Sequence, residues 1–134
     1  MSCLAARFLM DANYEPIAED RPLTEQEYRL TRWMLEHGWP EALGYIEQLE
    51  RAKVVSRCPC GCASIDFAIE GVPRAVGGMQ ILADFEFGDE AHLCGAFVFA
   101  KNGVLSGLEV CGYAIDAPKV LPEPPELRPL SVTS

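Results

Sequence analysis

The hydrophobic pattern of this 134-residue chain changes its period near Val54. Before that point, apolar residues such as Leu30, Trp33 and Met34 recur every three or four positions, which is the spacing of one helical face. After it, apolar and polar residues alternate, most clearly over residues 65–69, as in a strand with one buried face. Helical and strand patterns that are separated along the chain indicate an α+β fold. We therefore predict two N-terminal helices packed on one face of a sheet of four to five mainly antiparallel strands.

Two short helices are predicted before residue 54. Thr24 and Glu27 have the spacing of a capping box, in which the hydroxyl accepts from the third helical amide and the carboxylate reaches back. Gly38 suits the position just after a helix end. Pro40 can occupy the first turn of a second helix. This second helix would direct three residues inward, Leu43, Ile46 and Leu49.

The dipeptide Asn102-Gly103 is the strongest turn signal in the chain. A two-residue type I′ turn needs positive φ at both positions, which asparagine and glycine tolerate. With that turn, Phe97 would face Leu108 across a hairpin, on the face that we expect to form the core. The other face would pair Ala96 with Glu109 and Cys94 with Cys111, and would carry the acidic residues.

The length fits one domain, since domains mostly contain ~100–150 residues. We expect a single α+β domain over residues 22–116, preceded by an N-terminal segment and linker over residues 1–21. The apolar stretch 4–10 in that segment is compatible with a strand or a helix. Residues 117–134 contain five prolines and are expected to form an extended tail, because proline lacks the amide hydrogen that a sheet or helix uses.

The charge balance is strongly acidic, with 20 acidic and 11 basic residues and a formal net charge of −9. Direct binding to nucleic acid needs clustered lysine and arginine, so this balance argues against it. No apolar run approaches the ~18 residues of a membrane span. Because Arg7 interrupts the first apolar stretch, we expect no signal peptide. These features favour a cytoplasmic location, where thiols stay reduced.

The run Cys58-Pro59-Cys60-Gly61-Cys62 places three thiols at a spacing of two. In an extended backbone they would lie on one side and could begin a zinc site, although common zinc knuckles separate paired cysteines by two to four residues. Burial around a tight glycine turn is the simpler interpretation, because cysteine often packs as a small hydrophobe. We therefore expect no cofactor, with zinc as the alternative. Further ligands would have to come from Cys94, Cys111 or His92.

Acidic side chains gather on the strands of the second half of the chain. A solvated sheet face explains such a pattern. A surface for a basic partner explains it equally well, because a field of one sign raises the encounter rate. The candidate partner-binding residues are Asp66, Glu70, Asp84, Glu86, Asp89, Glu90 and Glu109.

Motifs of established catalytic chemistry are missing from the sequence. It contains no Gly-x-Ser-x-Gly elbow, no phosphate-binding loop and no His-Glu-x-x-His motif. The only two histidines are His37 and His92, and a Cys94–His92 pair, which could suggest a nucleophile, has no evident orienting third group. We therefore assign no catalytic residue and expect a protein that is not an enzyme.

Four segments carry a resemblance to known proteins: residues 21–24 (Arg-Pro-Leu-Thr), 57–65 (Arg-Cys-Pro-Cys-Gly-Cys-Ala-Ser-Ile), 103–110 (Gly-Val-Leu-Ser-Gly-Leu-Glu-Val) and 121–124 (Leu-Pro-Glu-Pro). Together they resemble a family of small, uncharacterised bacterial proteins with a Cys-x-Cys-Gly-Cys-x-Ser motif. The chain departs from that pattern at Ala63, where proline is common, and the family implies no catalytic residue. Small acidic proteins of this kind are also similar to toxin-immunity proteins, including those of contact-dependent growth inhibition.

The resemblance and the charge lead to a first functional hypothesis. The chain would be a cytosolic immunity protein or antitoxin that binds and neutralises a basic protein toxin, such as a nuclease, through an acidic sheet face. An acidic surface would both steer toward and cover the basic groove that a nuclease needs for phosphate. The alternative is a zinc-binding or thiol-redox module built on Cys58, Cys60 and Cys62.

Overall fold

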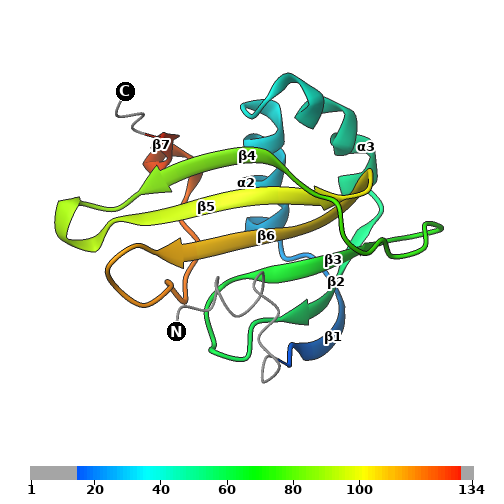
Figure 1. Cartoon of the computed structure of the whole chain (residues 1–134), viewed down its shortest axis with the longest axis horizontal. Coiled ribbons are helices and arrows are strands. Elements are labelled where there is room, and N and C mark those ends of the chain that lie inside the picture. The colour runs from blue at the N-terminus through cyan, green and yellow to red at the C-terminus, as the bar shows by residue number, and fades with distance from the viewer. Residues whose placement is uncertain (1–14, 131–134) are drawn as a thin grey trace.

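The computed structural model describes residues 15–130, which form one seven-stranded antiparallel sheet with two α-helices (Figure 1). The strands are β1 (Ile17–Pro22), β2 (Ala52–Arg57), β3 (Ile65–Ile69), β4 (Met79–Phe87), β5 (Cys94–Lys101), β6 (Val104–Gly112) and β7 (Arg128–Pro129). Their order across the sheet is β1-β2-β3-β6-β5-β4-β7, and all six pairings are antiparallel. The prediction of an α+β fold is confirmed. The expected number of four to five strands is wrong, because the sheet has seven.

The two additional strands form the edges of the sheet and come from segments that we expected to lie outside it. Strand β1 pairs with β2, and β7 pairs with residues Phe85 and Glu86 of β4. Neither strand has an alternating pattern, since β1 is largely charged and exposed and β7 has only two residues, one of them Pro129. Charges, proline and short length are common at sheet edges because they discourage further strand pairing. The apolar stretch 4–10 lies outside the described residues.

Helix α2 (Glu25–Glu36) begins at the predicted capping box. The Thr24 hydroxyl accepts from the Glu27 amide at 3.1 Å, and the Glu27 carboxylate accepts from the Thr24 amide at 2.9 Å. The segment after Gly38 is a 3₁₀ helix (Pro40–Tyr45) that continues into the short helix α3 (Ile46–Leu49). Leu43 is therefore 57% exposed, contrary to the expected inward orientation, whereas Leu49 is buried.

The β5–β6 hairpin turns at Asn102-Gly103 as predicted, with φ of 46° and 80°. Lys101 pairs with Val104 next to the turn, as a two-residue loop requires. A β-bulge at Ser106 then shifts the register by one residue, so that Phe97 pairs with Glu109 instead of Leu108. A shift of one residue moves each following side chain to the other face of its strand.

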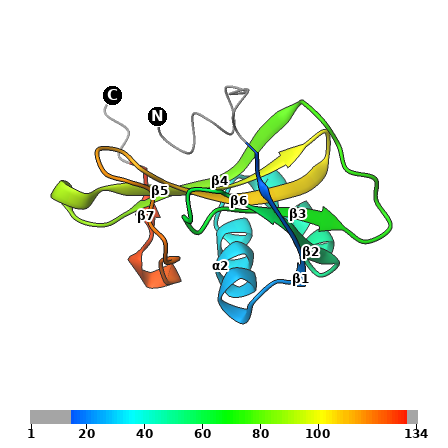
Figure 2. The ribbon, with the colours of Figure 1, turned by 90° about the horizontal axis from the view of Figure 1, so that it is seen from below.

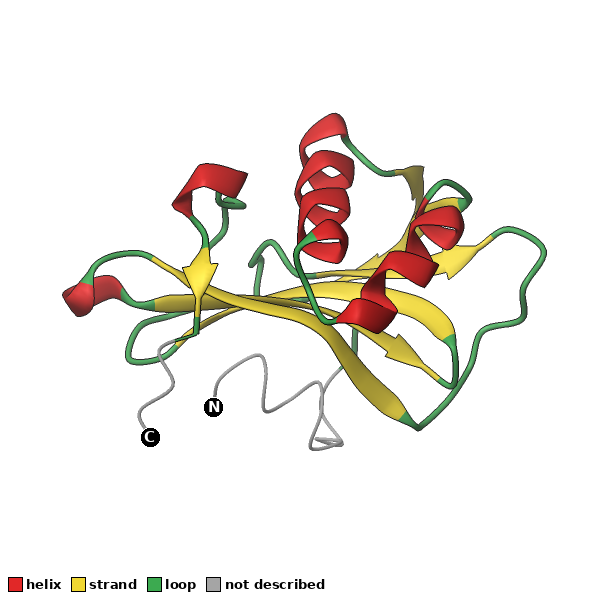
Figure 3. Ribbon diagram, turned by 90° about the horizontal axis from the view of Figure 1, so that it is seen from above, coloured by secondary structure: helices red, strands yellow, loops and turns green. Residues whose placement is uncertain are grey.

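The bulge decides which residues share a face of the sheet. Both helices lie on one side of the sheet (Figures 2 and 3), where the Trp33 ring of α2 contacts the Phe85 ring of β4 at 5.2 Å between centroids. That side holds the main core, which includes Val98 and Val110. Phe97 and Phe99 lie on the opposite face and are also buried. The face of Phe97, which we expected to form the core, therefore lies opposite the main core, although Phe97 itself is buried.

The same shift corrects the expected cysteine pair. Cys94 pairs with Gly112, and Cys111 pairs with Gly95. Cys94 therefore belongs to the core beneath the helices, while Cys111 lies on the other face. None of the helices in residues 15–130 combines the length and the apolar character that crossing a membrane would need.

Candidate metal centre

The three cysteines of the 58–62 run lie in the loop between β2 and β3. Cys58 follows the last residue of β2, and its carbonyl accepts from the Gly61 amide at 3.2 Å, which closes a β-turn. Proline at the second position of a turn fixes its φ, so Pro59 favours this conformation. Gly61 has a φ of +87°, a region that residues with a Cβ rarely adopt. The sequence thus folds the loop back so that the third cysteine returns toward the first.

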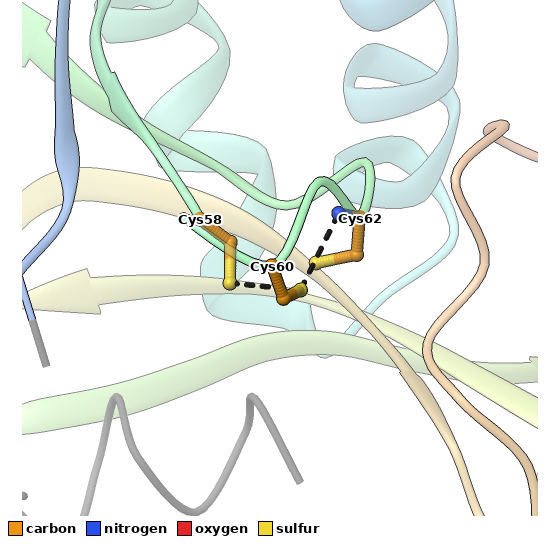
Figure 4. A group of neighbouring side chains, drawn as sticks. All are labelled: Cys58, Cys60 and Cys62. Atoms are coloured by element: carbon orange, nitrogen blue, oxygen red, sulfur yellow. Dashed lines mark hydrogen bonds between the residues drawn. The ribbon is translucent and has the colours of Figure 1, made fainter.

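This fold-back brings the three thiols together (Figure 4). Each Sγ lies within 4.8 Å of the other two, and the Sγ atoms of Cys58 and Cys60 are 3.1 Å apart. The Cys62 amide donates to the Cys60 sulfur at 3.4 Å. Cys58 and Cys62 are buried, whereas Cys60 is exposed. The site therefore has two sulfurs held inside the fold and one that faces solvent.

Ser64 attaches this loop to the centre of the sheet, a role that the sequence analysis missed. Its hydroxyl accepts from the Val110 amide at 3.0 Å and donates to the Val110 carbonyl at 3.2 Å. The Cys62 thiol lies 3.4 Å from the same hydroxyl. The Ala63 amide donates to the Pro118 carbonyl at 3.0 Å. The signal in the sequence that could have indicated this role was a serine two residues after the last cysteine.

The three sulfurs have the spacing that a thiolate-bound metal ion needs. Tetrahedral zinc with Zn–S bonds of ~2.3 Å places its sulfur ligands about 3.8 Å apart. The observed separations, from 3.1 Å to at most 4.8 Å, bracket that value. Thiolates are soft ligands that favour zinc and copper(I) over magnesium or calcium. The residues present therefore fit a soft metal ion.

The remaining described cysteines do not join this group. Within residues 15–130, only Cys58, Cys60 and Cys62 form a cluster of three or more candidate ligands. Burial raises the pKa of Cys94, and it raises the pKa of Cys111 to about 11, with the neighbouring Glu109 and Asp84 adding to the effect. Both thiols thus stay protonated near neutral pH. His92 lies on the surface, with its ring nitrogen 3.0 Å from Asp89.

The predicted partner-binding acids are only partly accessible. Four of these acids share the sheet face that points away from the helices: Asp66, Asp84, Glu86 and Glu109. Asp84 and Glu109 both pair with Phe97, Glu86 pairs with Gly95, and Asp66 pairs with Gly107, and these partners lie on that face. Glu109 is fully buried and Glu86 is 7% exposed, so this face is not a fully solvated acidic surface. Burial raises the pKa of the half-buried Asp84.

The exposed members of the acidic set lie in two separate places on the molecule. Asp89 and Glu90 follow β4, while Glu70 follows β3 at the other end of the sheet (Figure 1). Asp89 accepts from the His92 ring, and this hydrogen bond lowers the pKa of Asp89. Partner binding by these residues stays a prediction, and it would have to use two separate patches or the partly covered face between them.

Comparisons with known proteins do not assign a function to this chain, so its function has to be inferred from the geometry of the site. No protein-family model matches this chain, and no curated protein or solved structure matches it either.

Proposed function

We propose that this protein is a metal-binding protein whose thiolate site is formed by Cys58, Cys60 and Cys62, with zinc as the expected ion. The observation that carries the proposal is the mutual distance of the three sulfurs, each within 4.8 Å of the others. Thiols that only filled space in the core would not need to converge on one point. One of these three, Cys60, is exposed and still lies with the other two.

The anchoring of the loop supports this proposal. The turn at residues 58–61, the Ser64 hydroxyl and the Pro118 carbonyl hold the loop before any metal arrives. Binding to a site that is already ordered costs less conformational entropy, so the affinity is higher. The ligands must lose their protons to bind, and the metal supplies the positive charge that stabilises the thiolates. A bound ion would then act as a cross-link within the β2–β3 loop.

Metal titration of the reduced, full-length protein tests the proposal. We expect one zinc or cobalt(II) ion per chain in native mass spectrometry, and a thiolate-to-cobalt charge-transfer band in the absorption spectrum. Cys60→Ser should weaken binding by more than about tenfold, since it removes a direct ligand. Because Cys60 is exposed, the variant should keep the stability of the metal-free protein.

Cys111→Ala is the matched control, because it also removes one thiol but lies outside the cluster. It should bind metal like the wild-type protein. If the wild-type protein binds no soft metal ion, or if Cys60→Ser binds it with unchanged affinity, the proposed function is wrong.

A further inference from the structure

The loop of residues 70–78 joins β3 to β4 and projects beyond the end of the sheet (Figure 1). Pro73, Arg74 and Val76 are exposed at its tip, and the exposed fraction of Val76 reaches 85%. Among the residues that the structure describes, the backbone of residues 73–75 makes no hydrogen bond. The tip of the loop therefore has backbone groups that another protein could bond.

Both ends of this loop are held by the fold. The Val72 side chain packs against the core, and its amide donates to the Ile69 carbonyl at 3.1 Å. The Asn102 side chain donates to the Val76 carbonyl at 2.8 Å, and the Asn102 amide donates to the Gly78 carbonyl at 3.2 Å. These contacts present the tip in a defined place at the end of the sheet.

The sequence at the tip favours an extended backbone. Proline fixes its own φ at about −65° and restricts the residue before it to extended conformations, so Val72 and Pro73 resist helical folding. A serine endopeptidase binds an extended segment through backbone hydrogen bonds, in the manner of an added strand. The residue after Arg74 is Ala75, which is small and has an ordinary amide nitrogen. This stretch thus has the backbone of a protease substrate.

Arg74 differs from the other arginines of residues 15–130 in its ionic contacts. Six of them pair with carboxylates: Arg21, Arg29, Arg32, Arg51, Arg57 and Arg128. Within this same range, Arg74 makes neither an ion pair nor a side-chain hydrogen bond. Its guanidinium can therefore enter the acidic pocket with which trypsin-like enzymes select a basic residue before the cleaved bond.

The exposed Lys119 also has no ion pair among the described residues, but the fold holds its neighbours. The Pro118 carbonyl accepts from the β2–β3 loop at 3.0 Å. Leu121 is buried, and its carbonyl accepts from the Gln26 side chain at 3.3 Å. An enzyme must open several residues on each side of the bond that it cleaves. The bond after Lys119 is therefore better protected than the bond after Arg74.

We propose that the β3–β4 loop is a processing site for a trypsin-like serine endopeptidase, which hydrolyses the Arg74–Ala75 bond. The serine of the enzyme attacks the Arg74 carbonyl carbon, and the Ala75 nitrogen leaves with a proton as a free amine. Water then releases the Arg74 carboxylate from the acyl-enzyme, so each cleavage consumes one water. This inference does not depend on the metal site.

The fold should hold the two products together. Strand β3 precedes the cleaved bond and pairs with β6, which follows it. The Ser64 hydroxyl bonds the amide and the carbonyl of Val110 across the same boundary. We therefore expect the cleaved protein to remain a folded complex of two chains.

Limited digestion of the folded, full-length protein with trypsin tests this assignment. Intact-mass spectrometry should first show one fragment that ends at Arg74 and another that begins at Ala75, and the two should coelute in size-exclusion chromatography. Arg74→Gln cannot pair with the acidic pocket, so cleavage at this bond should slow by at least about a hundredfold. Arg74→Lys keeps the positive charge and should still be cleaved.

Lys119→Gln is the matched control, because it also removes an exposed basic residue without an ion pair among the described residues. It should be cleaved at the Arg74–Ala75 bond at the rate of the wild-type protein. The inference is wrong if the first cut within residues 15–130 falls at another bond, or if the protein resists trypsin until urea unfolds it. Trypsin that binds the loop without cleaving it would also overturn the inference, since the loop would then be an inhibitor. Fragments that separate on cleavage would refute the two-chain product.

Discussion

Ser64→Ala should destabilise the protein far more than the loss of a single hydroxyl suggests. Ser64 is fully buried, and its hydroxyl bonds both the amide and the carbonyl of Val110 in the middle of β6. Alanine removes the partner of two backbone groups and supplies no replacement. Removing the partner of one buried polar group costs about 1–3 kcal/mol. Since Val110 loses two, we expect the free energy of unfolding to fall by about 2–4 kcal/mol.

Urea denaturation followed by circular dichroism measures this change. The same loss of free energy lowers the melting temperature by about 7–14 °C for a chain of 134 residues, because the unfolding entropy is ~2.1 cal/mol/K per residue. Ser106→Ala is the control, because that serine is half-exposed and its hydroxyl bonds only the nearby Val104 carbonyl. It should cost less than about 0.5 kcal/mol. If both variants lose the same stability, Ser64 does not connect the cysteine loop to β6 in the way the structure shows.

Three further predictions concern the helix cap and the thiols. Thr24→Ala removes the N-cap hydroxyl of α2 and should lower the free energy of unfolding by about 1 kcal/mol in urea denaturation; an unchanged midpoint would contradict the cap. Burial alone would raise the pKa of Glu27, but hydrogen bonds from the Arg21 guanidinium (2.9 and 3.0 Å) and the Thr24 amide outweigh it and lower that pKa below 4.5. A lowered pKa in the folded state means that this stabilisation is complete above the unfolded value of 4.5 and is lost as the pH falls through the folded value. Glu27→Gln should therefore flatten the acid limb of stability against pH, and an identical limb would refute this assignment. In metal-free protein, hydrogen peroxide should oxidise the exposed Cys60 to a sulfenic acid, with release of one water. The Cys58 thiol, 3.1 Å away, should then attack this sulfenic acid and release a second water, which leaves a Cys58–Cys60 disulfide. Peptide mapping would locate this bond, bound zinc should prevent it, and a different disulfide would contradict the geometry.

Local signals in the sequence predicted the parts of the fold that depend on neighbouring residues. The capping box at Thr24 and Glu27 and the turn at Asn102-Gly103 have the expected geometry. The strand register beyond the turn failed because it depends on contacts across the sheet. A Cβ on residue 107 would lie 2.7 Å from the Phe99 ring, so the bulge places Gly107, the one residue without a side chain, opposite that ring. A glycine inside a strand often marks a bulge, so Gly107 was the signal in the sequence that could have shown the shift.

The candidate site divides in the same way. The spacing of Cys58, Cys60 and Cys62 predicted that their thiols could lie on one side of an extended backbone, whereas the structure brings them together through a local turn at residues 58–61. The exposure of the acidic face was not predictable, because it depends on the register and on which segments cover the sheet. Glu109 was expected in a solvated position, and its burial follows from tertiary packing that the alternating pattern of β6 does not reveal.

The single additional residue at Ser106 makes the position of a length change in β6 decisive. A deletion of Ser106 would remove the bulge and leave Gly107 opposite Phe99 and Glu109 opposite Phe97, so the residues from Gly107 to Gly112 would keep their faces. A deletion of Leu108 would instead place Glu109 opposite Val98, in the apolar layer beneath the helices, and Val110 would leave that layer. Strand β6 should therefore tolerate the loss of one residue at the bulge far better than the loss of one residue beyond it.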